Sequence, residues 1–564
     1  MAAIDERAAG AKAANAGRAA SGLTIVVADW IIECRGWQRH LVALVAGAVS
    51  VLAMAPFFLW PVLFITLPVL VWLIDAPDGS GRPLRAAATS GWFFGFGYFF
   101  AGLFWIGEAF LVEAEIFAWL LPFAITIMPA GLALFYAAAA AAARVWWPAG
   151  VARLLVLAVT FAMAEWLRGH VLTGFPWNVL GYALTPTLPL MQAAGVLGIY
   201  GLTLWTVVVG AGPLVLAADA ERHCQRRRGL LAGLGMALVP LAASYAHGVI
   251  RLKDGPVMSQ PHLNVRIVQP SVPQRDKWRP EKQGEIFRDH LYLSRRDATG
   301  AVDDLAGVSL LVWPEAAMPF LPLSTPEALT AIADLVPDGV HLVTGALRVE
   351  GRSAAPGSGA RQRDAYNSLM VFDSAGRLAA LYDKIHLVPF GEYLPFQTAL
   401  ESIGLQQLTR MRGGFAAGRS PRPLISIPGL PVFGGLICYE AIFPAAVVQD
   451  RERPQFLVNV TNDGWFGNTT GPRQHFHQSR IRAVEEGLPL VRAANNGISA
   501  VIDGQGRVLA RLGLDRRGVV DHAIPPARPT TLYSSFGDAI FLLNALAFLL
   551  TAFLISRPRI MTKS

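Results

Sequence analysis

Long runs of hydrophobic residues fill the first half of the chain and return once near its end. From about residue 40 to residue 247 these runs are separated by short polar connections, whereas residues 248–535 have the mixed pattern of a globular domain. A helix needs about 20 apolar residues to cross the hydrocarbon core of a bilayer. The pattern predicts eight spanning helices, at about residues 40–56, 58–75, 88–107, 116–143, 151–167, 193–217, 229–247 and 536–555.

The globular region alternates short apolar runs with polar or amphipathic stretches. Residues 265–270, 309–313 and 456–460 are typical of buried β-strands, and residues 281–295 and 473–486 are typical of helices. Strands that alternate with helices indicate a layered α/β domain. The sequence therefore predicts a transmembrane helical bundle joined to an α/β domain.

Composition agrees with a membrane protein. Of the 564 residues, 53% are hydrophobic and only 16% are charged, against about 25% charged in typical soluble domains. The formal net charge is +8, but Arg222 and Arg226–Arg228 cluster between two apolar segments, as a topology signal would. We therefore expect no nucleic-acid partner. No metal or cofactor is expected either, because no metal-ligand spacing joins the three cysteines, Cys34, Cys224 and Cys438.

The distribution of lysine and arginine predicts the orientation in the membrane. These residues occur in both terminal tails and in the connections that hold Arg82, Arg144 and Arg226–Arg228, whereas the acidic connection at 108–115 has none. By the positive-inside rule both termini are cytoplasmic and the globular domain lies outside the cytoplasm. The predicted parts are a cytoplasmic tail with an interfacial segment, a seven-helix membrane domain, a periplasmic catalytic domain, a C-terminal membrane helix and a cytoplasmic tail, at residues 1–39, 40–247, 248–535, 536–556 and 557–564.

The connection at residues 169–192 is rich in aromatic residues, and two interpretations of it stay open. Its rings form an interfacial belt at the membrane surface, or they line the wall of a lipid-access site beneath the globular domain. The same aromatic chemistry suits both.

Three reactive residues lie among or just beyond apolar runs of the globular region. Cys438 directly follows the run 433–437, Glu315 follows 310–313, and Lys384 lies among apolar and aromatic residues. Taken singly, Cys438 is explained as a small buried hydrophobe, Glu315 as a first-turn acid of a helix, and Lys384 as a surface lysine. Taken together they form a set that suits nucleophilic catalysis.

A cysteine attacks as its thiolate and therefore requires a base or a cation nearby. Glu315 is expected to be the general base that accepts the thiol proton. Lys384 is expected to stabilise the thiolate and then the oxyanion of a tetrahedral intermediate. Cys438 is then the nucleophile and carries a thioester, which a second nucleophile activated by Glu315 resolves.

The motifs around these residues resemble the nitrilase (carbon–nitrogen hydrolase) superfamily and, within it, the apolipoprotein N-acyltransferase family. The resemblance covers nearly the whole chain beyond residue 40. It rests on the motifs at residues 174–177, 313–315, 384–395, 438–440, 461–467 and 495–499, and on the arrangement of seven helices followed by one. It implies an αββα sandwich with a Glu-Lys-Cys triad.

The resemblance also implies a reaction at the outer face of a bacterial inner membrane. An acyl chain passes from a phospholipid to Cys438, and then to the α-amino group of the S-diacylglyceryl cysteine of an apolipoprotein, as the last step of lipoprotein maturation. The implied partners are the phospholipid donor, the diacylglyceryl apolipoprotein acceptor and the bilayer. Glu392, Tyr439 and Glu440 match supporting residues of the family, and Trp278 resembles a tryptophan on a substrate-facing arm.

Two other functions agree less well with the sequence. A membrane-anchored amidase or nitrilase would hydrolyse a carbon–nitrogen bond with water, but one helix suffices as an anchor. A transporter would carry buried ionisable groups along a path through its helices, whereas only Glu108 and Glu165 qualify, and both lie near helix ends.

Residues 397–411 have apolar side chains close to helical spacing, with arginines at the end of the stretch. They predict either a mobile lid that enters the membrane interface or a helix packed on the domain itself.

Overall fold

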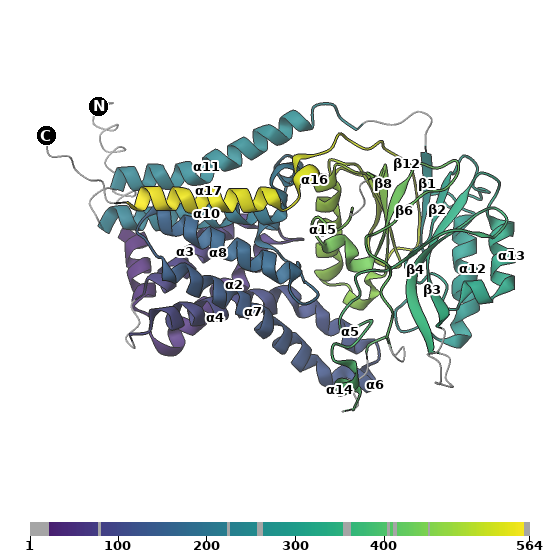
Figure 1. The fold of residues 1–564 in the computed structure, drawn as a ribbon, viewed down its shortest axis with the longest axis horizontal. Coiled ribbons are helices and arrows are strands. Elements are labelled where there is room, and N and C mark those ends of the chain that lie inside the picture. The colour runs from purple at the N-terminus through teal and green to yellow at the C-terminus, as the bar shows by residue number, and fades with distance from the viewer. Residues whose placement is uncertain are drawn as a thin grey trace, which may run out of the picture. The chain divides into compact units, whose positions relative to one another are not determined.

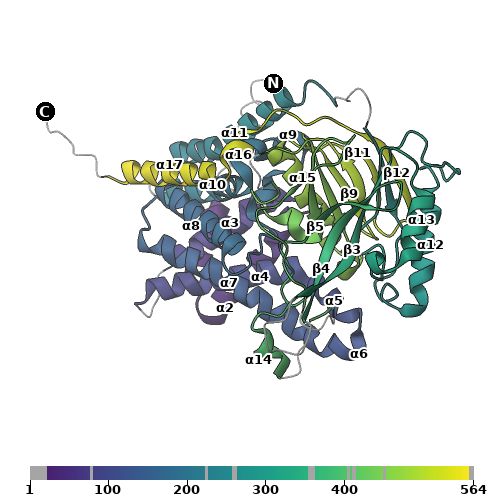
Figure 2. The same ribbon diagram turned by 45° about the vertical axis from the view of Figure 1, so that its right-hand side comes forward.

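The computed structural model describes residues 22–76, 81–222, 226–256, 263–352, 362–402, 407–409, 414–448 and 452–557. Their helices and strands are labelled in Figures 1 and 2. The chain forms two compact units, each described below by itself. The first unit runs as far as residue 104 and takes in residues 125–250 and the chain from residue 538 on, and the second comprises residues 105–124 and 251–537.

Apolar helices build the first unit. In the described residues six stretches are long and apolar enough to cross a membrane, at Gly36–Ala53, Pro83–Leu111, Ala114–Val145, Ala194–Ala220, Arg228–Arg251 and Ala539–Ser556. Their main helices are α2 (Gly36–Ser50), α4 (Pro83–Leu103), α7 (Leu121–Val145), α10 (Ala194–Arg222), α11 (Arg226–Arg251) and α17 (Ala539–Ser556). The other two predicted spans are also helical: α3 (Leu63–Asp75) is shorter, and α8 (Val151–His170) buries Arg153, Glu165 and Arg168.

The aromatic connection at residues 169–192 is folded into the first unit. Glu165 of α8 accepts a hydrogen bond from the amide of Leu180 at 3.0 Å and so ties the connection to the helix. Trp177 and Tyr182 are buried. An interfacial belt requires rings at the lipid surface, so that interpretation is wrong for these two rings.

Two six-stranded sheets form the second unit. Their strand orders are β12-β1-β2-β3-β4-β5 and β11-β10-β9-β8-β7-β6. The strands are β1 (Leu263–Gln269), β2 (Leu310–Val312), β3 (His341–Arg352), β4 (Gln362–Phe372), β5 (Leu378–Asp383), β6 (Leu424–Ile425), β7 (Phe433–Ile437), β8 (Phe456–Thr461), β9 (Leu490–Ala494), β10 (Ser499–Ile502), β11 (Val508–Leu512) and β12 (Gly518–Ile524). The three strands β1 to β3 pair in parallel, as do β7 to β9, and the flanking strands are antiparallel.

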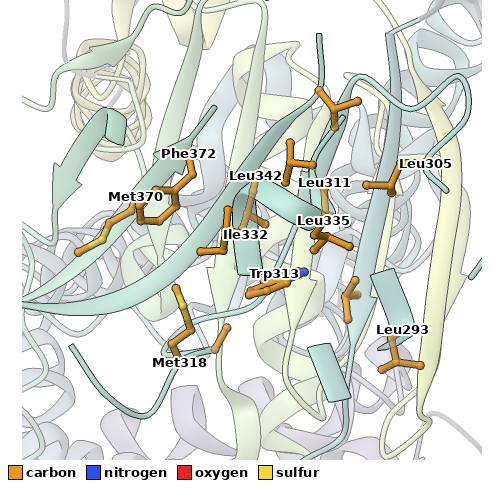
Figure 3. Packing of buried hydrophobic residues seen from close by; sticks show 14 of the residues in the cluster. Leu293, Leu305, Leu311, Trp313, Met318, Ile332, Leu335, Leu342, Met370 and Phe372 are labelled. Atoms are coloured by element: carbon orange, nitrogen blue, oxygen red, sulfur yellow. The ribbon is translucent and has the colours of Figure 1, made fainter. Parts of the chain in front are cut away.

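Helices cover the outer face of each sheet. Figures 1 and 2 show α12 (Gln283–Ser294) and α13 (Pro326–Leu335) along the first sheet, and α15 (Gly471–Glu486) along the second. An apolar cluster that includes Trp313, Ile332 and Leu342 joins the first sheet to its helices (Figure 3). Strand β3 contacts β8, and β4 contacts β7, so the two sheets pack on each other. The predicted αββα sandwich is confirmed.

Residues 105–124, predicted as the ends of two spanning helices and their connection, belong to the second unit. They form the short helices α5 (Glu108–Leu111) and α6 (Ala114–Phe117). The indole of Trp105 donates a hydrogen bond to Gln474 on α15 at 3.2 Å, and its ring centroid lies 4.6 Å from that of Phe466. The segment is therefore packed against the sandwich.

The proposed lid coincides only in part with the described residues. Helix α14 (Gln397–Ser402) has six residues and buries none of them. Residues 403–406 and 410–413 lie outside the described residues. The choice between a lid and a packed helix over 397–411 therefore stays a prediction.

Candidate active site

Three reactive side chains lie just beyond the ends of strands in the sandwich. Strand β2 ends three residues before Glu315, β5 ends directly before Lys384, and β7 ends directly before Cys438. All three are buried, with 7%, 1% and 6% of their surface exposed. The charges of Glu315 and Lys384 both act on the Cys438 thiol, so the two sheets contribute to one buried cluster.

The ammonium group of Lys384 is held mainly by Glu392. Its Nζ lies 2.8 Å from Glu392 Oε2 and 3.9 Å from Glu315 Oε1. The Asn367 side-chain amide bridges the two carboxylates, donating to Glu315 Oε1 at 2.7 Å and to Glu392 Oε1 at 2.9 Å. Asn367 lies in the middle of β4, so the strand itself fixes both acids around the lysine. This leaves one oxygen of Glu315 free of the bridging amide.

Burial and neighbouring charges set the protonation states of the cluster. Burial raises the pKa of the Glu315 carboxyl, and the nearby Lys384 only partly offsets that rise. Burial opposes a charge on Lys384, but the carboxylates of Glu392 and Glu315 raise the pKa of its ammonium above the usual value. Burial and the carboxylate of Glu315 raise the pKa of the Cys438 thiol. Cys438 is therefore protonated at rest and requires a base to become a nucleophile.

Cys438 has an unusual backbone conformation. Its φ of 51° lies in the left-handed region, which residues other than glycine rarely occupy and which clusters at functional sites. Asn459 of β8 donates a hydrogen bond to the Cys438 carbonyl at 3.2 Å. The chain thus turns sharply between the end of β7 and the helical turn Cys438–Ile442, with Cys438 at the turn.

Glu440 joins the loop that carries Cys438 to the loop that carries Lys384. Its carboxylate accepts hydrogen bonds from the amide of Ile437 at 2.8 Å and from the amide of Ile385 at 3.0 Å. Arg422 pairs with it at 3.0 Å, and Tyr382 donates its hydroxyl proton at 2.8 Å. Although burial opposes the charge, Arg422 and the backbone amides of Ile437 and His386 lower the pKa of Glu440. A carboxylate that already accepts this many hydrogen bonds is suited to positioning the two loops and not to accepting a proton.

Tyr439 lies beside the lysine. Its hydroxyl donates to the carbonyl of Leu387 at 3.0 Å, and Lys384 Nζ lies 5.6 Å from the centre of its ring. The face of an aromatic ring attracts a cation at this distance. Tyr439 thus forms one side of the space around the lysine.

Trp278 lies at the surface, with 42% of its area exposed, while the adjacent Lys277 is 2% exposed. The described contacts do not bring the indole of Trp278 to the triad. Lys277 does reach it: Nζ donates to the backbone carbonyl of Glu315 at 2.9 Å. Sequence reasoning missed Lys277, Asn367 and Arg422. Of these three, only Asn367 could have been found from the sequence, because it is an amide residue inside a stretch that is otherwise typical of a β-strand.

A second buried polar cluster lies beside the cysteine. Asp463 accepts hydrogen bonds from Arg492 Nη2 at 2.9 Å and contacts His475 Nδ1 at 2.9 Å. Burial opposes its charge, but Arg492 and His475 lower the pKa of Asp463 to about 2. The motif at 461–467 therefore provides a fixed negative charge that also acts on Cys438.

Comparison with known proteins places these features in context. Two family models match: "Apolipoprotein N-acyltransferase N-terminal domain" at residues 46–212 and "Carbon-nitrogen hydrolase" at residues 264–532. The apolipoprotein N-acyltransferase of Rhodopseudomonas palustris is 48% identical over 92% of this chain and 95% of its own length. That of Bradyrhizobium diazoefficiens is 48% identical over 92% and 96%. An amidase structure from Nesterenkonia sp. AN1 is 21% identical, with a TM-score of 0.34, over 51% of this chain and 99% of its own.

Proposed function

Because this chain belongs to the apolipoprotein N-acyltransferase family, we propose that it transfers an acyl chain from a phospholipid to the N-terminal S-diacylglyceryl cysteine of an apolipoprotein. The enzyme is an acyltransferase and a membrane protein. The observation that carries the proposal is the buried cluster of Glu315, Lys384 and Cys438, in a chain that also has a bundle of apolar helices.

In the first step Glu315 accepts the thiol proton while Cys438 Sγ attacks the ester carbonyl of the phospholipid. The carbonyl oxygen becomes an oxyanion, and the ammonium of Lys384 stabilises it. The intermediate collapses by breaking the bond to the glycerol oxygen. That oxygen takes the proton from Glu315 and leaves as a lysophospholipid, and the acyl chain stays on Cys438 as a thioester.

In the second step the α-amino group of the apolipoprotein attacks the thioester. Glu315, again a carboxylate, accepts a proton from the attacking nitrogen. Lys384 stabilises the second oxyanion, and the carbon–sulfur bond breaks as the amide forms. The thiolate of Cys438 recovers its proton from Glu315, so both residues return to their starting states.

Each supporting residue has its own role. Glu392 holds the charge of Lys384 at 2.8 Å, and Glu440 holds the loops of Lys384 and Cys438 together through backbone amides. Tyr439 borders the lysine, and Trp278 is assigned a place on the route of the acyl chains because its indole is exposed beside the buried Lys277. The arginine and lysine distribution supports a periplasmic catalytic domain in the bacterial inner membrane.

Acyl transfer through a thioester is tested by incubating the purified protein with acyl-labelled phospholipid. We expect label on the protein that neutral hydroxylamine releases, and none on the variant Cys438→Ala. Cys34→Ala is the matched control because Cys34 is the other free, buried cysteine among the described residues. It should keep the label.

The acceptor is tested by adding a diacylglyceryl peptide with a free N-terminal cysteine. We expect the label to move to this peptide and not to the same peptide with an acetylated amine. Folded protein that takes no label from phospholipid, yet releases ammonia from simple amides, would overturn the proposal in favour of a membrane-anchored amidase.

A further inference from the structure

Lys277 is a buried lysine beside the proposed active site. It lies on the turn between β1 and α12, and only 2% of its surface is exposed. Its ammonium donates to the backbone carbonyl of Glu315 at 2.9 Å. In the part of the chain that the structure describes it forms no ion pair with a carboxylate. Lysine is almost never buried in this way.

An ammonium group removed from water costs several kcal/mol unless an opposite charge compensates it. Burial accordingly lowers the pKa of Lys277 to about 8, while Glu315 and Cys438 favour its charged form. His290 of α12 is the other titratable group that interacts with it. Burial lowers the pKa of His290 to about 4, so His290 is neutral at pH 7. Near neutral pH, Lys277 is thus a cation whose charge interacts with Glu315 and Cys438, while the neighbouring His290 is neutral.

The two buried lysines of the site differ in their surroundings. Lys384 is paired with Glu392 at 2.8 Å, so the two charges largely cancel when seen from Cys438. Among the residues that the structure describes, Lys277 has only a neutral carbonyl as its hydrogen-bond acceptor. Its positive charge is therefore the less compensated of the two when negative charge moves from Glu315 to Cys438.

We propose that Lys277 is a positioning residue and the second cation of the site: it fixes the backbone of Glu315 and favours the thiolate of Cys438. The proton passes from Cys438 Sγ to a Glu315 carboxylate oxygen, so one negative charge leaves Glu315 and appears on sulfur, while Lys277 keeps its proton. The inference rests on the proposed role of Cys438 as the nucleophile.

The charge of Lys277 is tested by the rate at which iodoacetamide, a neutral reagent, alkylates Cys438 between about pH 6 and 10, measured on the Cys438 peptide by mass spectrometry. An opposite charge nearby typically shifts a pKa by one unit or more. We expect Lys277→Met to react about tenfold more slowly below pH 8. The difference in alkylation rate between this variant and the wild type should become smaller at higher pH, because Lys277 of the wild type loses its own proton there.

Three further variants distinguish the effect of the Lys277 charge from the effect of losing its hydrogen bond or its packing. Lys277→Arg keeps the charge and should retain the wild-type rate, without a narrowing at high pH. Lys277→Gln keeps a donor for the Glu315 carbonyl but no charge, and it should resemble Lys277→Met even if the latter folds poorly. Lys282→Met is the control, because Lys282 lies nearby with 39% of its side chain exposed. It should match the wild type.

The inference is overturned if Lys277→Gln is alkylated at the wild-type rate at every pH. It is also overturned if the alkylation rate of the variant is lower than that of the wild type by the same factor at every pH. Its failure is distinct from failure of the acyltransferase proposal. If Cys438 of the wild type is alkylated with the expected Lys277 dependence but takes no acyl group from phospholipid, only the acyl-transfer proposal fails.

Discussion

The carboxylate of Glu392 lies 2.8 Å from the ammonium nitrogen of Lys384. This pairing leaves the more distant acid, Glu315, as the carboxylate that is available to accept a proton. Two acids thus share one lysine, and we propose that they have different roles. The one closer to the lysine would hold its charge, and the other would exchange protons with the thiol.

Replacing Glu392 with glutamine should change which acid pairs with the lysine. Without the carboxylate of Glu392, Lys384 is drawn to Glu315, and an ion pair there makes Glu315 a weaker base. We expect thioester formation to slow about 100-fold, the lower end of the contribution of a well-placed general base. Glu350→Gln is the control, because Glu350 forms an exposed ion pair on β3. Equal acylation rates in the two variants would contradict the assignment.

The acylation rate should depend on pH through Glu315. Burial raises the pKa of this carboxyl, and it acts as a base only when it is deprotonated. The single-turnover rate of acylation should therefore increase as the pH rises through that pKa, which lies above the ordinary value for a glutamate. Lys384 remains a cation throughout, because its pKa is raised. Glu315→Gln should be slow and should lose this rise; a rise that persists in the variant would assign it to another group.

Gly345 leaves no room for a side chain beside Glu315, the proposed general base. A Cβ on this residue would lie 2.5 Å from the Cα of Glu315 and 2.8 Å from the backbone nitrogen of Ala316. Because backbone cannot yield as a side-chain end can, Gly345→Ala should displace Glu315 and reduce acylation by about 100-fold. Gly351→Ala lies on the same strand, where a Cβ meets nothing within 4 Å. It should leave acylation unchanged, and similar losses in both variants would refute the steric explanation.

The Glu440–Arg422 pair should be coupled in a double-mutant cycle. Removing one partner leaves a buried charge alone, so Glu440→Gln and Arg422→Met should each lower the free energy of unfolding by about 3–5 kcal/mol. The double variant should lose less than the sum of the two single losses. The measurement is denaturant unfolding of the purified protein. Additive losses would mean that the two charges do not depend on each other.

The same pair has a predictable pH dependence. The pKa of Glu440 is lowered in the folded protein, so its charge contributes stability above the ordinary glutamate pKa, and that contribution is lost as the pH falls through the lowered value. The difference in stability between the wild type and Glu440→Gln should therefore shrink in acid. A difference that is unchanged at low pH would contradict the lowered pKa.

The sequence predicted most of the sandwich because its buried strands are apolar. The runs before Glu315 and Cys438 are continuous and short, and they became β2 and β7. Strands β9, β11 and β12 escaped prediction, because Arg492, Arg511 and Asp521 interrupt their apolar pattern. Arg492 is buried, where Asp463 compensates its charge. A local pattern does not reveal such a distant partner.

The site residues that we predicted were the reactive groups and, from the family resemblance, Glu392, Tyr439 and Glu440. Glu315, Lys384 and Cys438 have chemistry that marks them in the sequence, whereas Lys277 looks like a surface lysine among polar neighbours. Arg422 lies in a loop with no local pattern to indicate that it is buried. The roles of Lys277 and Arg422 depend on residues distant in the sequence, Glu315 and Glu440, which the fold places in contact with them.

The packing of residues 105–124 against the sandwich has a consequence for how the chain threads the bilayer. A compact globular unit lies on one face of a membrane, so the chain between residues 124 and 251 must cross an even number of times. Helices α7, α10 and α11 are long and apolar enough to be three of these crossings. An even number of crossings then predicts that α8 crosses as well, with Glu165 and Arg168 inside the bundle. We thus expect α8 to span the membrane, although it buries three charged residues, because of how residues 105–124 pack.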